Sequence, residues 1–137
     1  MKGNTYLLLV VDRKHAKLFT LFNGIVESKG VYIEGNVPQK VKHGDDTWDS
    51  PDKIFRHTED HLHRYLVKVR DAVDDLVKKN HIDGIIIGSH KPLFPKIKKL
   101  FNPPVEKKIK GTFVTEVKVP FNEILKRARA VISQIET

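Results

Sequence analysis

The stretch Thr5-Tyr6-Leu7-Leu8-Leu9-Val10-Val11 is apolar almost throughout and shows no alternation of apolar and polar residues. A strand of this kind is covered on both faces, so we expect it at the centre of a sheet. The polar residues 12–15 form a turn, and the alternation over Ala16 to Phe22 predicts a second strand. Asn23-Gly24 tolerates positive φ and predicts a hairpin into a third strand from about Ile25 to Ile33. The chain therefore opens with an antiparallel meander.

A polar stretch from Gly35 to Asp49 contains Pro38 and Gly44 and has no regular period, so we expect a long exposed loop there. Ser50-Pro51-Asp52 predicts a helix start, because it supplies a capping oxygen, a preset φ and a carboxylate at the positive end of the helix dipole. The helix is expected to run to about Lys79. Its apolar stripe consists of Ile54, Thr58, Leu62, Tyr65, Leu66, Val69, Val73, Leu76 and Val77.

The second half of the chain alternates strands and helices. Ile82 to Ile87, which ends at Gly88, suits a buried parallel strand. A short helix is expected across Leu93 to Phe101, stopped by the prolines of residues 102–104. A last strand over Thr112 to Val119 and a helix after Pro120 complete the order βββαβαβα. This order predicts an α/β fold with a ribonuclease-H-like mixed sheet, in a single domain that covers residues 1–137.

Size and composition limit the class of protein. The 137 residues, 39% hydrophobic and 31% charged, fit one globular domain. No apolar run approaches the roughly 20 residues needed to cross a bilayer, and the residues after Met1 suit a strand better than a secretory signal. The absence of cysteine excludes a disulfide framework and a thiolate nucleophile. We therefore expect a cytoplasmic protein without a membrane partner.

The formal charge of +8 indicates an anionic partner or, more simply, solubility. The densest positive region follows Gly88 and is opposed only by Glu106, and we interpret it as an anion site. Phe94 and Phe101 within it have the spacing of core residues, which we favour over base stacking. Its cations are Lys91, Lys96, Lys98, Lys99, Lys107, Lys108 and Lys110.

A polar ridge follows one side of the predicted long helix. His57, His61, Arg64 and Lys68 are spaced at i, i+4, i+7 and i+11, which aligns them along the helix. The ridge either follows a phosphate backbone or is a solvated face. His57 and His61 also have the spacing of two helical metal ligands, but no third ligand accompanies them, so we predict neither a metal nor a cofactor.

Short landmarks recur in a fixed order along nearly the whole chain. They are Leu9-Val10-Val11-Asp12 with Ala16-x-Leu18-Phe19, Val37-Pro38-x-Lys40, Arg56 with Arg64-Tyr65, Ile86-Ile87-Gly88, and Lys108-Ile109-x-Gly111. In order and spacing these segments resemble the middle domain of archaeal and eukaryotic class-one peptide-chain release factors and their bacterial relatives. The resemblance implies the ribonuclease-H-like fold, although fold similarity alone does not deliver a function.

In the family, the loop after Val-Pro-x-Lys carries a Gly-Gly-Gln tip that positions a water against the peptidyl-tRNA ester. Here residues 42–50 read Lys-His-Gly-Asp-Asp-Thr-Trp-Asp-Ser, and the glutamine position falls near Asp49. Aspartate and tryptophan resist backbone dihedrals that glycine permits. Some relatives, such as the Pelota-like rescue factors, also lack the tip and recognise stalled ribosomes. The resemblance thus implies a non-hydrolytic domain that binds ribosomal RNA or tRNA in termination or ribosome rescue.

We expect the basic side chains of the loop, the long helix and the lysine-rich region to contact this RNA. Gly44 and Trp48 mark the loop tip, where the indole is either a contact anchor or a plug for the core. The predicted RNA-binding residues are Lys40, Lys42, His43, His57, His61, Arg64, Lys68, Lys91, Lys96, Lys98, Lys99, Lys107, Lys108 and Lys110.

Two enzymatic alternatives stay open. A peptidyl-tRNA hydrolase would use a loop carboxylate as general base, with Asp45, Asp46 and Asp49 as the candidates, although their charges also repel tRNA phosphates. A ribonuclease-H-like nuclease would hold two magnesium ions with Asp12, Asp83 and either Asp45 or Asp46. A turn role for Asp12 is simpler. Gly88-Ser89-His90 follows a strand, where α/β sheets often bind ligands, but the motif is too short to be specific.

Overall fold

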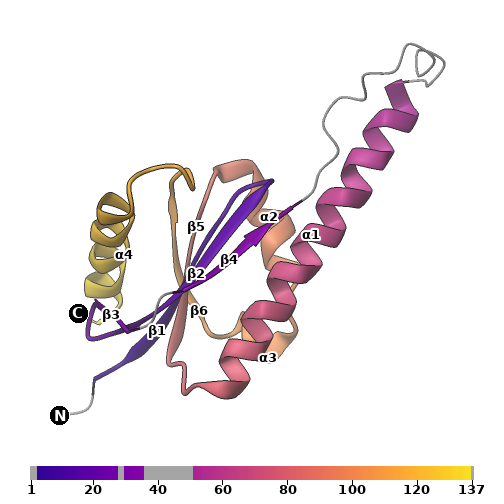
Figure 1. Cartoon of the computed structure of the whole chain (residues 1–137). Helices are drawn as coiled ribbons and strands as arrows, with labels where there is room; N and C mark the ends of the chain where they lie inside the picture. Colours follow the sequence, from indigo (N-terminus) through magenta and orange to yellow (C-terminus); the bar gives the residue numbers. More distant parts are fainter. Residues whose placement is uncertain (1–2, 28–29, 36–50, 137) are drawn as a thin grey trace.

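The computed structural model describes residues 3–27, 30–35 and 51–136, with the backbone alone over 51–58 (Figure 1). Four strands precede the long helix, where the sequence predicted three. The elements are β1 (Thr5–Val11), β2 (His15–Phe22), β3 (Ile25–Val26), β4 (Val31–Glu34), α1 (Pro51–Lys79), β5 (Gly84–Ser89), the 3-10 helix η2 (Lys91–Leu93), α2 (Phe94–Lys98), α3 (Pro103–Glu106), β6 (Ile109–Val114) and α4 (Phe121–Ile135).

One mixed sheet forms the centre of the molecule, with the order β3-β2-β1-β5-β6, and β4 pairs with β2 beside β3. β1 is antiparallel to β2 and parallel to β5, and β5 is parallel to β6. The central position of the apolar first strand and the mixed, ribonuclease-H-like sheet are therefore confirmed. At the β2–β3 hairpin Asn23 and Gly24 have φ of 54° and 79°, as the Asn-Gly signal predicts.

Helices cover both faces of the sheet (Figure 1). The side chains of β1 alternate between two cores: Leu7, Leu9 and Val11 pack with α1, α2 and α3, whereas Tyr6, Leu8 and Val10 pack with α4. Each fully buried aliphatic side chain contributes roughly 1.5–3 kcal/mol to folding, so a strand buried on both faces anchors the domain. Most of the predicted apolar stripe of α1 is in this core, namely Leu62, Tyr65, Leu66, Val69, Val73, Leu76 and Val77.

The predicted third strand is in fact two short strands. Gly30, with a φ of 79°, immediately precedes β4, and β3 and β4 pair with opposite ends of β2. The 35–50 loop lies outside the described residues except for Gly35. The N–H of Gly35 donates to the carbonyl of Lys14 at 2.6 Å.

The last strand was predicted too late in the sequence. β6 ends at Val114, and the Thr115 N–H still donates to the carbonyl of Ser89 at 3.0 Å. Beyond Thr115 the predicted alternation continues only as burial, with Val117 buried. This segment turns instead, because the Val119 N–H donates to the carbonyl of Glu116 at 3.2 Å. The alternation of apolar and polar residues here reflects burial and not a continued strand.

Two further boundaries differ from the prediction. β5 begins at Gly84, two residues after the predicted start at Ile82, although Ile82 is itself buried. Pro103 and Pro104 do follow the short helix, but they also begin α3, because proline at the first positions of a helix gives up no N–H that the helix needs. Across the described residues, no helix has the length and apolarity that a membrane span requires.

Candidate functional site

The seven lysines after Gly88 lie close to one another in the sequence but not in space. Because β6 runs parallel to β5, its start lies at the opposite end of the sheet from the end of β5. Lys91 therefore lies at one end of the domain, and Lys108 and Lys110 lie at the other. Lys98, Lys99 and Lys107 are exposed on the intervening α2–α3 segment. The region is a band of cations along one helical layer, not a single patch.

Two of these lysines have structural partners. Lys96 Nζ lies 3.2 Å from a carboxylate oxygen of Glu59 on α1, and the other oxygen of Glu59 lies 3.4 Å from Arg13. The hydrogen bond from Lys96, followed by the charge of Lys96 and the bond from Arg13, holds the pKa of Glu59 below its usual range. Lys108 Nζ donates to the carbonyl of Ile82 at 3.1 Å. Lys96 and Lys108 therefore make contacts within the domain as well as carrying charge.

A shallow groove of about 210 Å³ separates α1 from the α2 segment. The α1 side presents Glu59 and His63, and the α2 side presents Lys96 and Lys99. Phe101 is buried and Phe94 packs against the same core, so the core interpretation of both aromatic rings is confirmed. Burial excludes the stacking of bases on Phe101, and Phe94 is partly buried against the same core.

The polar ridge of α1 is described in part. Arg64 and Lys68 are exposed and His61 is half-buried, whereas the side chain of His57 lies outside the described residues. These residues lie along a different side of α1 from the side chains that line the groove. Among the side chains that the structure describes, no group of three or more His, Asp or Glu residues is arranged to hold a metal ion.

The proposed joint metal site of Asp12 and Asp83 is wrong. In the parallel pair of β1 and β5, Tyr6 lies opposite Gly84 and Val10 opposite Gly88. Asp83 therefore precedes the amino end of β5, while Asp12 follows the carboxyl end of β1, roughly 20 Å away at about 3.3 Å per residue. Two magnesium ions of one nuclease site lie only about 4 Å apart, so these carboxylates cannot share them.

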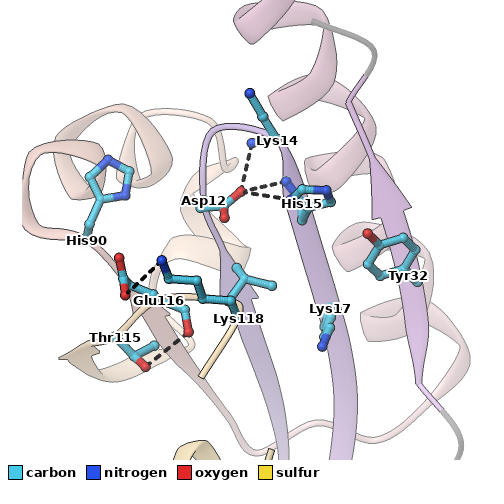
Figure 2. A pocket seen from close by; sticks show the side chains of 10 residues that line it. Asp12, Lys14, His15, Lys17, Tyr32, His90, Thr115, Glu116 and Lys118 are labelled. Atoms are coloured by element: carbon cyan, nitrogen blue, oxygen red, sulfur yellow. Dashed lines mark hydrogen bonds and ion pairs between the residues drawn. The ribbon is translucent and has the colours of Figure 1, made fainter. Parts of the chain in front are cut away.

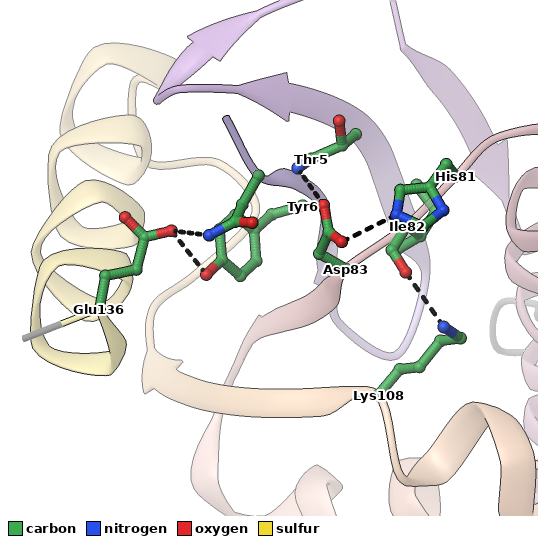
Figure 3. Close-up of polar contacts among 8 residues, drawn as sticks. Thr5, Tyr6, His81, Ile82, Asp83, Lys108 and Glu136 are labelled. Atoms are coloured by element: carbon green, nitrogen blue, oxygen red, sulfur yellow. Dashed lines mark hydrogen bonds and ion pairs between the residues drawn. The ribbon is translucent and has the colours of Figure 1, made fainter. Parts of the chain in front are cut away.

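Each of the two carboxylates has a structural role. Asp12 Oδ1 accepts the N–H groups of Lys14 at 2.7 Å and His15 at 2.6 Å, which fixes the β1–β2 turn as the simpler interpretation predicted. Asp83 Oδ2 accepts the N–H of Thr5 at 2.8 Å, and Oδ1 lies 2.9 Å from His81 Nε2 (Figure 3). The bond from Thr5 is the main cause that lowers the pKa of Asp83.

A cleft of about 690 Å³ opens at the carboxyl end of β1 (Figure 2). His15 and Lys17 of β2 lie on one side with Tyr32 of β4, and the segment that follows β6 lies on the other. Sequence reasoning singled out only Asp12 and the Gly88-Ser89-His90 segment here. The cleft is lined by Asp12, Lys14, His15, Lys17, Tyr32, His90, Thr115, Glu116, Val117 and Lys118.

Aromatic and charged groups face this cleft. The ring of His15 stacks on that of Tyr32 with centroids 6.0 Å apart and planes inclined by 26°. Tyr32 pairs across the strands with Lys17, which explains why the two side chains share a face. Lys118 Nζ lies 4.0 Å from Glu116, at the limit of an ion pair. The period of two in β2 was the one sequence signal that aligned His15 with Lys17.

The predicted loop residues lie outside the described part of the chain. They are the cations Lys40, Lys42 and His43, the tip residues Gly44 and Trp48, and the carboxylates Asp45, Asp46 and Asp49. Their roles in binding or hydrolysis stay predictions.

The sheet order, the two helical layers and the long first helix define a domain with the fold of the release-factor middle domains. Residues 2–133 match the family described as Bacterial archaeo-eukaryotic release factor family 10. The chain belongs to this family, and that membership supports a role in translation.

Solved structures show the same fold at low sequence identity. The archaeal translation termination factor aRF1 is similar with a TM-score of 0.60 and 14% identity, over 97% of this chain and 40% of that one. Pelota of Archaeoglobus fulgidus is similar with a TM-score of 0.54 and 13% identity, over 99% of this chain and 34% of that one. The chain thus spans less than half the length of either relative. No curated protein matches it by sequence.

Proposed function

We propose that the chain is a non-hydrolytic binding domain of translation, which docks its basic surface on ribosomal RNA or tRNA during termination or ribosome rescue. The observation that carries the proposal is the band of exposed cations on the α2–α3 layer, in a domain of the release-factor family. Lys98, Lys99 and Lys107 are the exposed members at its centre. A cytoplasmic location, where ribosomes work, is part of the same proposal.

Electrostatics favours nucleic acid as the partner of this band. Lysines that contact phosphates release condensed counterions, which gives an affinity that falls steeply with salt. Glu59 neutralises Lys96 and Arg13 locally, and Glu106 is the acidic residue within the band. The remaining exposed lysines and Arg64 of α1 present positive charge over a length that suits an extended phosphate backbone better than a single small anion.

The absence of a Gly-Gly-Gln tip from the sequence supports binding without ester hydrolysis. A Gln side chain and a flexible Gly-Gly backbone are the groups that position water in the family, and residues 42–50 contain no glutamine and the single glycine Gly44. The hydrolase alternative needs Asp45, Asp46 or Asp49 to replace them. Peptidyl-tRNA cleavage that disappears with Asp46→Asn or Asp49→Asn would favour that alternative.

Ribosome co-sedimentation at several salt concentrations tests the binding proposal. The double change Lys98→Glu with Lys99→Glu should weaken association about tenfold or more, because it reverses charge at the centre of the band. A matched control is Lys78→Glu with Lys126→Glu, which makes the same charge change at exposed positions away from α2. Lys108 is a poor choice, since its bond to Ile82 supports the fold.

Three results would reject the proposal. Unchanged association of the Lys98/Lys99 variant is the first, and an equal loss in both variants is the second, because it would indicate nonspecific attraction to net charge. A wild-type affinity that does not fall with salt is the third, since no phosphates would then be neutralised.

A further inference from the structure

We propose that the cleft at the carboxyl end of β1 binds a single nucleotide, with its phosphate among the lysines and its base against Tyr32. This site goes beyond the proposed function, which uses the band of cations on the α2–α3 layer together with Arg64 of α1. The cleft lies on the side of the sheet that α4 covers, because His15 and Lys17 alternate with residues that face the other core. The two sites can therefore be tested separately.

The topology explains why a cleft forms at this position. After β5 the chain passes through His90 to η2 and α2, which cover one face, whereas after β6 it passes through 115–118 to α4 on the other face. When the connections of two neighbouring parallel strands leave toward opposite faces of the sheet, a crevice forms at the carboxyl ends of the strands. Ligands of open α/β sheets bind in this crevice. His90 and the 115–118 segment lie on the lining of the cleft, as this geometry requires.

The charges of the lining favour an anion. Lys14, Lys17 and Lys118 contribute three positive charges against the two carboxylates of Asp12 and Glu116, which leaves a formal charge of +1 when the histidines are neutral. One oxygen of Asp12 is already occupied by two backbone N–H groups of the turn. Glu116 reaches Lys118 only at 4.0 Å, so a phosphate can compete for that ammonium group. His15 and His90 offer further ring nitrogens.

The aromatic side distinguishes a nucleotide from a bare anion. Tyr32 is 55% exposed, which is unusual for a large ring on a strand, and it is stacked on His15. Stacking of one base on an exposed aromatic ring is worth roughly 1–3 kcal/mol. The volume of about 690 Å³ falls within the range of small-molecule clefts and suits one nucleotide, while a duplex is far too large.

Titration of isotope-labelled protein with AMP, adenosine and inorganic phosphate, followed by amide NMR shifts, tests the site. AMP should bind about tenfold more tightly than adenosine or phosphate, because only AMP engages both groups of the cleft. The amide shifts should concentrate at His15, Lys17, Tyr32 and 115–118. The same spectra show whether each variant remains folded.

Three variants separate the two parts of the site. Tyr32→Ala should weaken AMP about tenfold and leave phosphate unchanged, whereas Lys118→Ala should weaken both. Lys126→Ala, on the exposed side of α4, is the control and should change neither. The Lys98→Glu and Lys99→Glu double variant should keep AMP binding, so failure of the ribosome test does not remove this site.

A short oligoribonucleotide distinguishes the two sources of the ligand. Binding about tenfold tighter than AMP at the same amides would assign the cleft to a nucleotide of an RNA chain, and weaker binding would assign it to a free nucleotide. The proposal is overturned if AMP at about 10 mM moves no cleft amide, or if adenosine binds as well as AMP. An equal effect of Tyr32→Ala and Lys126→Ala on AMP binding would also overturn it.

Discussion

Thr5 and Asp83 are joined by two hydrogen bonds of 2.8 Å: the Thr5 N–H donates to the Asp83 carboxylate (Figure 3), and the Asp83 N–H donates to the Thr5 carbonyl. This reciprocal pair fixes the start of β1 beside the start of β5. The pair lies just before the first paired residues of the β1–β5 ladder, which are Tyr6 and Gly84. One side-chain bond and one backbone bond therefore hold the starts of the two strands together.

We expect Asp83→Asn to lower the free energy of unfolding by about 1–2 kcal/mol at neutral pH, because a charged acceptor is replaced by a neutral one at a partly exposed site. The pKa of Asp83 is lowered in the folded state, so its contribution is present above the unfolded pKa of about 4 and is lost as pH falls below it. Urea unfolding at pH 7 and pH 3 measures this. A difference between variant and wild type that is as large at pH 3 would contradict it.

Glu59→Gln should strengthen RNA association, since it releases the charges of Lys96 and Arg13 to solvent. The slope of log affinity against log salt should steepen by about 1 to 2 if both cations reach phosphates. Stability should fall by less than about 1 kcal/mol, as expected for surface ion pairs. Glu123→Gln on α4 makes the same charge change away from the band and serves as control. Equal slopes for the two variants would contradict the prediction.

Gly30→Ala and Gly24→Ala form a matched pair, because both glycines have a φ of 79°. A Cβ at Gly24 would meet nothing closer than 3.7 Å, whereas one at Gly30 would lie 2.5 Å from the Phe19 ring and 2.7 Å from the Leu18 carbonyl. We expect a loss of about 1 kcal/mol for Gly24→Ala, from backbone conformation alone, and at least about 1 kcal/mol more for Gly30→Ala. Thermal unfolding of both variants measures these losses of stability. Equal losses for the two variants would contradict the prediction.

Burial, with the hydrogen bond to Glu136 as the next cause, raises the pKa of Tyr6 to about 12. Its hydroxyl donates to the Glu136 carboxylate at 2.9 Å, which links β1 to the residue after α4. Because this pKa is raised on folding, the stability that the protonated Tyr6 hydroxyl contributes is fully present below the unfolded pKa of about 10. This contribution is lost as pH rises toward 12. Tyr6→Phe should remove a late step from the phenolate absorbance titration. A titration curve unchanged by Tyr6→Phe would contradict this assignment.

The sequence was sufficient for the fold where one signal acts over a whole element. The unbroken apolar run of Thr5 to Val11 predicted a central strand, and the stripe through Leu62 and Val69 predicted a long helix against the sheet. Single-residue alternation was less reliable. Thr115 and Val117 alternate with polar residues and are buried, yet the Thr115 N–H still donates to the carbonyl of Ser89 whereas Val117 lies in a turn, because burial alone does not specify how far a ladder continues.

The candidate sites show what the sequence leaves out. Lysines that are neighbours between Lys91 and Lys110 are spread along the domain, since a parallel strand must start at the far end of the sheet. Conversely, Tyr32, His90 and Lys118 come from distant parts of the chain and line one cleft. Only the path of the backbone between the strands brings them together, and no local pattern encodes that path.

The turn at Asp12 has an effect beyond its own residues. Its carboxylate holds the N–H of Lys14, and the carbonyl of Lys14 in turn accepts the N–H of Gly35. The position of Gly35 is thus tied to a side chain more than twenty positions earlier in the sequence. An aspartate that closes one tight turn thereby also helps to anchor the residue that follows β4.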